Sequence, residues 1–250
     1  MMTDAELAAQ LATAAGAMLL DLQRQWDGDP AHLGKEGDAR ANAFLVEALR
    51  NARPDDGLLS EEERDSGERL AKSRVWIIDP VDGTREYGET TNGVARTDWA
   101  VHVALAINGA AAVGAVALPG LGLVLRNDRP ELVPPPPSAR LRIIVSRTRP
   151  AAPAVALAAA LGGELIAMGS AGAKAMAVVR GAADIYLHTG GQFEWDNCAP
   201  VAVALAHGLH CSRVDGAPLV YNNADTYVPD LLICRDEHAA MVLAEVAKQQ

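Results

Sequence analysis

The sequence predicts an α+β / α/β protein of two sub-domains, with an α+β first half and an α/β second half. The first half opens with helical stripes of apolar residues and continues with an uncharged run of alternating strands. The second half alternates short apolar strands with helices, which is typical of βα units packed on a sheet. Four consecutive prolines at 134–137 favour a stiff connector between the halves. We therefore expect sub-domains at 1–130 and 141–250, joined by a connector at 131–140.

Two helices are expected at the start of the chain. Thr3 and Glu6 have the spacing of a capping box, and apolar residues then recur on one stripe as far as Trp26. This pattern predicts a long amphipathic helix with one face in the core. A second amphipathic helix is expected from about Asp38 to Asn51.

Strands are expected next. Two short apolar segments, Leu58–Leu59 and Val75–Ile78, each end in acidic residues. The uncharged segment from Trp99 to Leu125 is long enough to suggest a membrane helix. It nevertheless alternates as strands do, and it contains a hairpin signal at Asn108-Gly109 and a break at Pro119-Gly120. We therefore expect a three-stranded antiparallel meander and no membrane span.

The second half is expected to alternate strands and helices. In chain order these are a strand at 141–145, a helix at 155–161, a strand at 165–169, a helix at about 171–180, a strand at 184–187, a helix at 197–207, a strand at 231–234 and a C-terminal helix. The same βα alternation argues for a sheet covered by helices.

Charge and composition exclude several functions. The chain carries 22 Lys and Arg against 32 Asp and Glu, a formal charge of −10, and has four Trp, four Tyr and two Phe. This acidic balance with few aromatic residues disfavours polymeric nucleic acid and anionic membranes as partners. Three widely spaced cysteines without a C-x-x-C pair, and an N-terminus without a basic segment ahead of an apolar one, predict a cytoplasmic protein.

The segment WIIDPVDGT at 76–84 carries the clearest chemical signal. A continuously apolar strand is buried on both faces, so the residues at its carboxyl end point into a cleft. Asp79 and Asp82 can then aim two carboxylates at one point, with the Val81 carbonyl between them, and such oxygen ligands suit Mg²⁺. An equally good account, for this motif alone, is a turn that Asp79-Pro80 begins and Asp82-Gly83 ends.

Acidic residues also stand at the ends of two other elements. Glu61 follows the short strand at 58–59, and Asp196 precedes the helix expected at 197–207. Glu61 has the alternative account of a solvated charged run, and Asp196 that of a helix cap. Taken one segment at a time, these accounts are as good as a metal site, and the combination favours a shared metal site because it matches the motifs of a known superfamily.

The ordered motifs resemble a known superfamily. LLSEEE (58–63), WIIDPVDGT (76–84), EWDNCAP (194–200) and DGAPLVYN (215–222) are similar to the signatures of the lithium-sensitive, magnesium-dependent phosphatases. That superfamily includes inositol monophosphatase, fructose-1,6-bisphosphatase and the 3′(2′),5′-bisphosphate nucleotidases. The resemblance implies an inositol-monophosphatase-like layered αβαβα sandwich.

Further residues are most similar to the CysQ-type nucleotidases, which act on 3′-phosphoadenosine 5′-phosphate (PAP), and to their actinobacterial branch. The run DGTREY (82–87) follows the nucleotidase pattern D-G-T-[KR]-E-[FY], and VSRT (145–148) resembles V-S-R-S. Lys174 stands where these enzymes carry a lysine. The run GSAGAK (169–174) is one residue longer than the usual G-S-x-x-K, and Lys35 replaces the threonine of a T-x-x-D motif that ends at Asp38.

The resemblance implies roles for the acidic residues. Glu61, Asp79 and the Val81 carbonyl would hold the Mg²⁺ that activates water, and Asp79, Asp82 and Asp196 would hold the one beside the leaving oxygen. Two or three Mg²⁺ are expected in all, with inhibition by Li⁺. Thr84 would orient the attacking water with Asp38 as its hydrogen-bond acceptor, although Asp38 is also a candidate helix N-cap.

Substrate contacts are expected from the glycine-containing and basic segments. Backbone N–H groups of Gly83 and Thr84 are candidates for holding a phosphoryl oxygen. A second phosphate needs further cations, and Lys174 is either such a cation or a solvated lysine. The full set of expected contacts is Gly83, Thr84, Arg85, Ser146, Arg147, Ser170 and Lys174.

The expected activity is hydrolysis of the 3′-phosphate of PAP, or of its sulfated form PAPS, in sulfur assimilation. Its expected partner is thus a small bisphosphorylated nucleotide, and the sequence is compatible with a homodimer. One alternative is a broader inositol or fructose-1,6-bisphosphate phosphatase, because the acidic motifs are common to all of these enzymes. Another is a non-catalytic nucleotide or metal sensor, which the intact acidic motifs disfavour.

Overall fold

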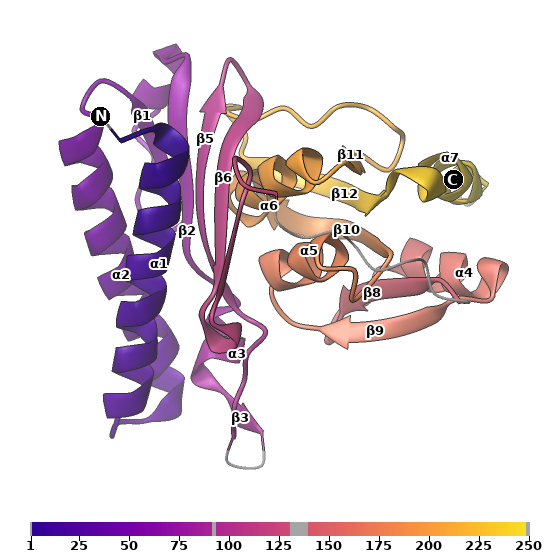
Figure 1. Ribbon diagram of the computed structural model, residues 1–250, viewed down its shortest axis with the longest axis horizontal. Helices are drawn as coiled ribbons and strands as arrows, with labels where there is room; N and C mark the ends of the chain where they lie inside the picture. The colour runs from indigo at the N-terminus through magenta and orange to yellow at the C-terminus, as the bar shows by residue number, and fades with distance from the viewer. Residues whose placement is uncertain (1, 92–93, 131–139, 249–250) are drawn as a thin grey trace.

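The protein is an αβαβα sandwich, as the family resemblance implies (Figure 1). The computed structural model describes residues 2–91, 94–130 and 140–248. Its first layer consists of α1 (Asp4–Gln25) and α2 (Pro30–Ala52), which cover one face of the first sheet. The other face of that sheet packs on α5 (Ala171–Val179) and α6 (Glu194–Ala206). Beyond them lies the second sheet, whose far face is covered by α4 (Ala152–Leu161) and α7 (Asp236–Ala247).

Each of the two main sheets has five strands. The first has the order β1-β2-β5-β6-β7, from β1 (Gly57–Ser60), β2 (Arg74–Asp82), β5 (Ala100–Ile107), β6 (Ala110–Leu118) and β7 (Leu123–Arg126). The second has the order β11-β12-β10-β8-β9, from β8 (Arg142–Ser146), β9 (Glu164–Met168), β10 (Ile185–Phe193), β11 (Leu209–Ser212) and β12 (Tyr227–Arg235). The short elements are α3 (Thr84–Gly88), a hairpin of β3 (Thr90–Thr91) and β4 (Val94–Ala95), and 3₁₀ turns at Glu68–Ala71 and Pro119–Leu121.

The predicted first helix and meander are both confirmed. The capping box is present, because Glu6 N–H donates to the Thr3 hydroxyl and the Glu6 carboxylate accepts from Thr3 N–H. By length and composition α1 could cross a membrane, but half of its most apolar stretch is buried against the first sheet. The segment that alone suggested a membrane helix forms β5, β6 and β7, which pair antiparallel as predicted.

The second helix begins at Pro30, eight residues before the expected start. Gly34 and Gly37 lower the helix propensity of this stretch, which explains the difference. In the fold, a Cβ at Gly34 would lie 2.7 Å from Thr84 Cγ2, and one at Gly37 would lie 2.5 Å from Tyr87 Cε1. Close packing of α2 on α3 therefore requires these glycines. Asp38 lies inside α2, so its expected alternative role as an N-cap is wrong.

The second half contains the predicted elements with altered bounds. The strand expected at 184–187 extends to Phe193, the helix expected from Asn197 begins at Glu194, and β11 was not predicted. Asp196 therefore lies within the first turn of α6 and not before it. The second sheet is mixed, because β8 runs parallel to β9 and β10 while β12 runs antiparallel to β10 and β11.

The expected connector at 131–140 falls outside the described residues except for its last residue. On either side of it, the first sheet uses residues 57–126 and the second uses residues 142–235. The division into sub-domains stays a prediction.

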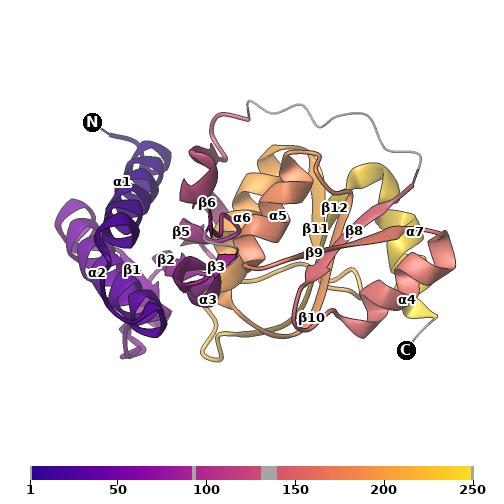
Figure 2. The same ribbon diagram turned by 90° about the horizontal axis from the view of Figure 1, so that it is seen from below.

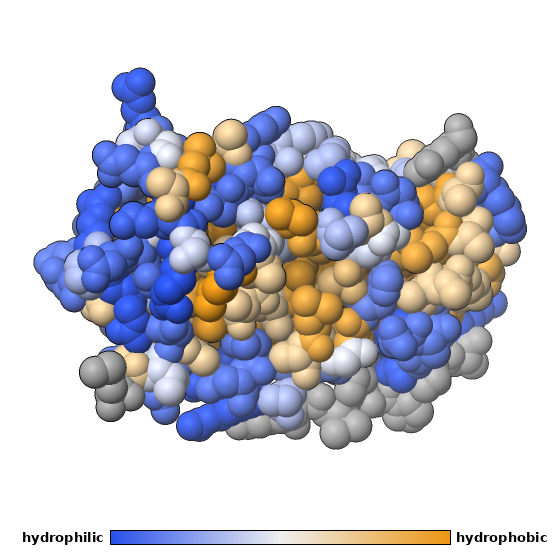
Figure 3. Space-filling view, turned by 90° about the horizontal axis from the view of Figure 1, so that it is seen from above, coloured by the Kyte–Doolittle hydropathy of each residue, from blue (hydrophilic) through white to orange (hydrophobic). Residues whose placement is uncertain are grey.

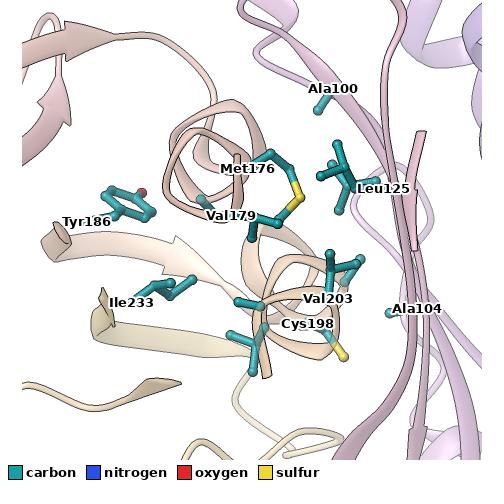
Figure 4. Packing of buried hydrophobic residues seen from close by; sticks show 14 of the residues in the cluster. Ala100, Ala104, Leu125, Met176, Val179, Tyr186, Cys198, Val203 and Ile233 are labelled. Carbon is teal, nitrogen blue, oxygen red and sulfur yellow. The ribbon is translucent and has the colours of Figure 1, made fainter. Parts of the chain in front are cut away.

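The central core lies between the two sheets and fixes α5 and α6 there (Figures 2 and 4). Met176 and Val179 of α5 and Val203 of α6 join side chains from both sheets. The three cysteines are free, and burial raises the pKa of the Cys198 thiol well above its usual range, in keeping with a packing role. From above, the surface at the α1–α2 end is mostly hydrophilic, and hydrophobic residues gather toward the middle and the far end (Figure 3).

A buried ion pair joins the start of β8 to the start of β10. Asp184, whose side chain is 1% exposed, accepts hydrogen bonds from Arg142 N (2.8 Å), Nε (3.0 Å) and Nη2 (2.7 Å). Burial raises the pKa of Asp184, but these hydrogen bonds outweigh it and hold that pKa below its usual range. The pair therefore links the parallel strands β8 and β10 where both begin.

We predict that Asp184→Asn lowers the free energy of unfolding by roughly 3 kcal/mol, because it leaves the Arg142 guanidinium with an incomplete partner in a largely buried place. The control is Asp128→Asn, which breaks a more exposed pair with Arg126 and should cost less than about 1 kcal/mol. Urea denaturation of both variants measures the difference. Equal losses would show that burial does not set the strength of the Asp184 pair.

Candidate active site

A cavity of about 610 Å³ opens between the two sheets. It lies where β2, β8 and β9 reach their carboxyl ends, which is where ligands bind in open α/β sheets. The predicted site residues that line it are Asp82, Gly83, Thr84, Arg85, Ser146, Arg147, Ser170, Lys174 and Asp196. The structure therefore brings together residues from four separate motifs.

Three carboxylates converge beside this cavity. Asp79, Asp82 and Asp196 each offer an oxygen, and these oxygens lie within 4.8 Å of one another. The first two are on β2, whose pairing with β5 is irregular between them, and Asp196 is on α6. Asp196 also accepts a hydrogen bond from Phe193 N (2.6 Å), so the helix-cap account and membership of the acidic cluster both hold.

Asp79 has the least compensated charge in the cluster. Its side chain is buried, and among the described residues its Oδ1 has no hydrogen-bond partner. Burial, followed by the charges of Glu61, Asp82 and Asp196, raises the pKa of Asp79 well above its usual range. A buried oxygen without a donor, surrounded by acids, fits a divalent cation that prefers oxygen ligands.

Glu61 lies beside Asp79 but outside the group of three. Glu61 is exposed. Removal from water raises the pKa of Glu61, a hydrogen bond with the Asp79 side chain opposes this, and the charges of Asp82 and Glu62 add to the rise. Glu61 is therefore in place to supply a further oxygen to a cation at Asp79.

Asp82 differs from Asp79 because protein donors surround it. Its oxygens accept from Ser170 Oγ, from Ala171 N (3.0 Å) and from Gly172 N at the start of α5. Burial opposes ionisation, but the hydrogen bond and charge of His102 outweigh it and set the pKa of Asp82 at about 2. This carboxylate is ionised at neutral pH.

His102 is buried in the core against the site. Its Nε2 is 3.2 Å from Asp82 Oδ2, and its Nδ1 is 3.0 Å from the Trp195 carbonyl oxygen. It thus joins Asp82 to the first turn of α6. A Cβ at Gly172 would lie 2.0 Å from His102 Nε2, which gives a reason for glycine in the lengthened GSAGAK run.

Thr84 and Asp38 lie close together, but Asp38 Oδ1 has no hydrogen-bond partner among the described residues, so the role of Asp38 as acceptor for the Thr84 hydroxyl stays a prediction. The Thr84 hydroxyl is 3.1 Å from the Val81 carbonyl oxygen, to which it donates. Burial and the charge of Glu62 raise the pKa of Asp38 to about 7, although a hydrogen bond with the Thr84 side chain lowers it. A second cavity of about 670 Å³ is lined here by Asp38, Thr84 and Arg85.

The basic side chains that were expected to bind substrate already have partners within the protein. Lys174 is buried, so its alternative account as a solvated lysine is wrong. Its Nζ donates to the Gly169 and Ser170 carbonyls, and burial lowers the pKa of Lys174 to about 8. Arg147 pairs with Glu86 at 3.2 Å and with Asp98 at 2.5 Å, and Arg85 pairs with Glu89.

Several cavity residues escaped the sequence reasoning. Arg149 and His188 line the cavity, and Phe193 stacks on Trp195 next to it, with ring centroids 4.9 Å apart. Tyr227 meets Phe193 edge to face. The only signal in the sequence was the proximity of Arg149 to the VSRT motif and of Phe193 and Trp195 to Asp196.

The fold and the acidic cavity together define a phosphatase-type α/β sandwich, and comparison with known proteins assigns its family. Residues 3–250 match the inositol monophosphatase family, and the chain belongs to it. A 3′-phosphoadenosine 5′-phosphate phosphatase of Mycobacterium leprae is 49% identical over 258 residues, covering 98% of this chain and 94% of that protein. The CysQ 3′(2′),5′-bisphosphate nucleotidase of Escherichia coli K12 is 27% identical, covering 85% and 88%.

Solved structures agree on the fold. CysQ from Bacteroides thetaiotaomicron has a TM-score of 0.79 at 23% identity, covering 94% of this chain and 97% of that one. Inositol monophosphatase from Anabaena has a TM-score of 0.76 at 22% identity, covering 98% and 95%.

We predict opposite effects of Asp79→Asn on stability and on metal binding. Without metal, the variant should melt several degrees higher than wild type, because one of four mutually repelling acids is neutralised. Added Mn²⁺ should raise the melting temperature of wild type and leave that of Asp79→Asn nearly unchanged. Thermal unfolding with EDTA or Mn²⁺ measures both effects, with Asp128→Asn as control. Equal stabilisation of wild type and Asp79→Asn by Mn²⁺ would remove Asp79 from the metal site.

The acidic cluster also predicts a pH dependence of stability. The pKa of Asp38 and that of Asp196 are both raised to about 7, in each case first by burial. Between pH 5 and 7 the folded protein thus holds protons that the unfolded chain releases, so stability falls as pH rises through this window. Burial lowers the pKa of His188 from 6.5 to about 4. Below pH 6.5 the unfolded chain therefore binds a proton that folded His188 does not, and this contribution makes stability rise with pH.

Urea denaturation in EDTA at pH 5, 6, 7 and 8 should show the net decrease in the free energy of unfolding. Saturating Mn²⁺ should reverse it, because the bound ion favours ionised carboxylates. A free energy of unfolding that rises from pH 5 to 8 in EDTA would contradict the pKa assignments.

Proposed function

We propose that this protein is a Mg²⁺-dependent phosphomonoesterase that hydrolyses the 3′-phosphate of PAP to give AMP and phosphate. The observation that carries the proposal is the convergence of Asp79, Asp82 and Asp196 on a cavity that also holds Lys174 and three arginines. Such a cavity suits a small substrate with more than one phosphate. The curated relatives at 49% identity carry the name of this activity.

Mg²⁺ would be held by carboxylates and one carbonyl. The proposed ligands are Glu61, Asp79, the Val81 carbonyl, Asp82 and Asp196, which would accommodate two or three ions. Bound there, Mg²⁺ lowers the pKa of a water molecule and neutralises charge on the phosphoryl oxygens. Occupation of one of these positions by Li⁺ would inhibit the enzyme.

Thr84 and Asp38 would position the attacking water. The Thr84 hydroxyl sits at the carboxyl end of β2, next to the Val81 carbonyl. For this role the Thr84 hydroxyl would rotate from the Val81 carbonyl to the Asp38 carboxylate. Its oxygen would then accept a hydrogen bond from the water, and that water's lone pair would face phosphorus. The ionised form of Asp38 is needed for this, and a cation beside Glu61 would favour that form by offsetting the acidic neighbours that raise the pKa.

The nucleotide would lie across the cavity, with the expected contacts Gly83, Thr84, Arg85, Ser146, Arg147, Ser170 and Lys174 on its walls. Ser170 caps α5 and bonds Asp82, so its side chain would act through Asp82 rather than on substrate. The Phe193–Trp195 stack beside the cavity offers a face for the adenine ring.

The proposal carries further expectations. The substrate is a small nucleotide from sulfur assimilation, PAP or PAPS, and polymeric nucleic acid and membranes are not partners. The net charge of −10 supports these exclusions. A cytoplasmic location and assembly as a homodimer are proposed with it.

Phosphate release from PAP, PAPS, inositol 1-phosphate and fructose 1,6-bisphosphate, with Mg²⁺ or EDTA, tests the function. We expect kcat/KM for PAP to exceed that for inositol 1-phosphate by at least about tenfold, since a second charged contact contributes that much. EDTA should abolish turnover, and millimolar Li⁺ should inhibit it. Similar values on all four substrates would favour the broader phosphatase, and no turnover with Mg²⁺ would favour a non-catalytic sensor.

A further inference from the structure

We infer that Arg149 recognises the second phosphate of the substrate, the one that is not hydrolysed. This assignment rests on the proposed function and names a residue outside the expected contacts. The phosphate to be removed must lie at the acidic cluster, where divalent cations offset its charge. The other phosphate needs a cation of the protein that no carboxylate already neutralises.

Arg149 lies in a part of the cavity wall that is held by hydrogen bonding and packing. It follows the end of β8, and its backbone N–H donates to Ser146 Oγ at 3.3 Å, which stabilises the turn. Across the cavity wall, β10 is irregular between Thr189 and Gln192. A Cβ built on Gly191, in that irregular stretch, would lie 4.0 Å from Arg149 Nη1. The guanidinium thus rests beside Gly191, with an exposed side toward the cavity.

The other cations of the cavity already have partners. The Arg147 guanidinium bonds Glu86 and Asp98, and Asp98 is also bound by Arg96 and by Gly169 N–H. Arg147 therefore supports the turn at Gly169 through Asp98. Its positive charge is already offset by Glu86 and Asp98, so it adds little positive charge to the cavity. Lys174 is directed to backbone carbonyls.

Arg149 stands apart from these cations. Within the described part of the chain, no carboxylate lies in ion-pair contact with it. The positive charge of Arg149 is therefore not neutralised by a described carboxylate, so Arg149 can bind an anion in the cavity.

His188 adds a neutral polar group at the same place. Its side chain lines the cavity, and its Nε2 is buried without a hydrogen-bond partner among the described residues. Burial, then the charges of Lys174 and Arg149, lower the pKa of His188 to about 4, so it is neutral at pH 7. A neutral imidazole carries one N–H, and in the tautomer with the proton on Nε2 it can donate a hydrogen bond to a phosphate oxygen next to the Arg149 guanidinium.

Two nucleotides that differ only in the second phosphate isolate this contact. We would measure kcat and KM for PAP and for adenosine 3′-phosphate with saturating Mg²⁺, in wild type, Arg149→Ala and Arg149→Lys. Arg149→Ala should lower kcat/KM for PAP by about 10- to 100-fold, mainly through KM, and that for adenosine 3′-phosphate by less than about threefold. Arg149→Lys should lose about 3- to 10-fold on PAP, because it keeps the charge without the guanidinium fork.

Two further variants serve as controls. Arg24→Ala removes an equal charge from an exposed pair on α1 and should leave both substrates unaffected. Arg147→Ala should affect both substrates similarly and lower the melting temperature, because it removes the ion-pair partner of Glu86 and one of the donors to Asp98.

The outcomes separate the inference from the proposed function. If wild type does not hydrolyse PAP, the proposed function fails and the inference fails with it. If wild type prefers PAP and Arg149→Ala keeps that preference, the inference alone is overturned. Selective loss of the PAP preference in Arg147→Ala would assign the contact to Arg147 instead.

Discussion

Mutual repulsion among buried and half-buried carboxylates is the constraint on which the structure depends. Asp79, Asp82 and Asp196 place oxygens within 4.8 Å of one another in a site largely removed from water. Two of these acids belong to the first sheet, and the third belongs to a helix that packs between the sheets. Such a site forms only if packing elsewhere outweighs the repulsion. The central core around α5 and α6 supplies that packing, and it is the same core that brings Asp196 to β2.

The fold compensates these charges unequally. Asp82 accepts hydrogen bonds from the start of α5 and lies 3.2 Å from His102 Nε2, and His102 Nδ1 lies 3.0 Å from the Trp195 carbonyl oxygen. Asp79 has no such donors, and burial among acids raises its pKa. Asp82 is therefore an ionised anchor with or without a cation, whereas burial among other acids disfavours the ionised form of Asp79 until a cation offsets their charge. This difference makes Asp79 the ligand that couples metal binding to stability.

The convergence of Asp79, Asp82 and Asp196 could be predicted because these residues stand at the ends of elements, where local patterns are strongest. Asp79 and Asp82 follow a continuous apolar run, and the fold class follows from the alternation of strands and helices. The start of α2 could not be predicted, because Gly34 lowers helix propensity and the helix exists through its packing on α3. The sequence also could not show which basic side chains of the cavity are already paired or buried. Burial of Lys174 and the pairing of Arg147 with Glu86 and Asp98 are tertiary contacts, so only the structure separates Arg147 from Arg149.

The most direct test of this account is a crystal structure of the protein soaked with Mn²⁺ and AMP, with Mn²⁺ located by anomalous scattering. We predict anomalous peaks in contact with Asp79, Asp82 and Asp196, and the AMP phosphate against Arg149. Anomalous peaks away from all three carboxylates, at full Mn²⁺ occupancy, would contradict the claim that the buried acids form the metal site of a phosphatase.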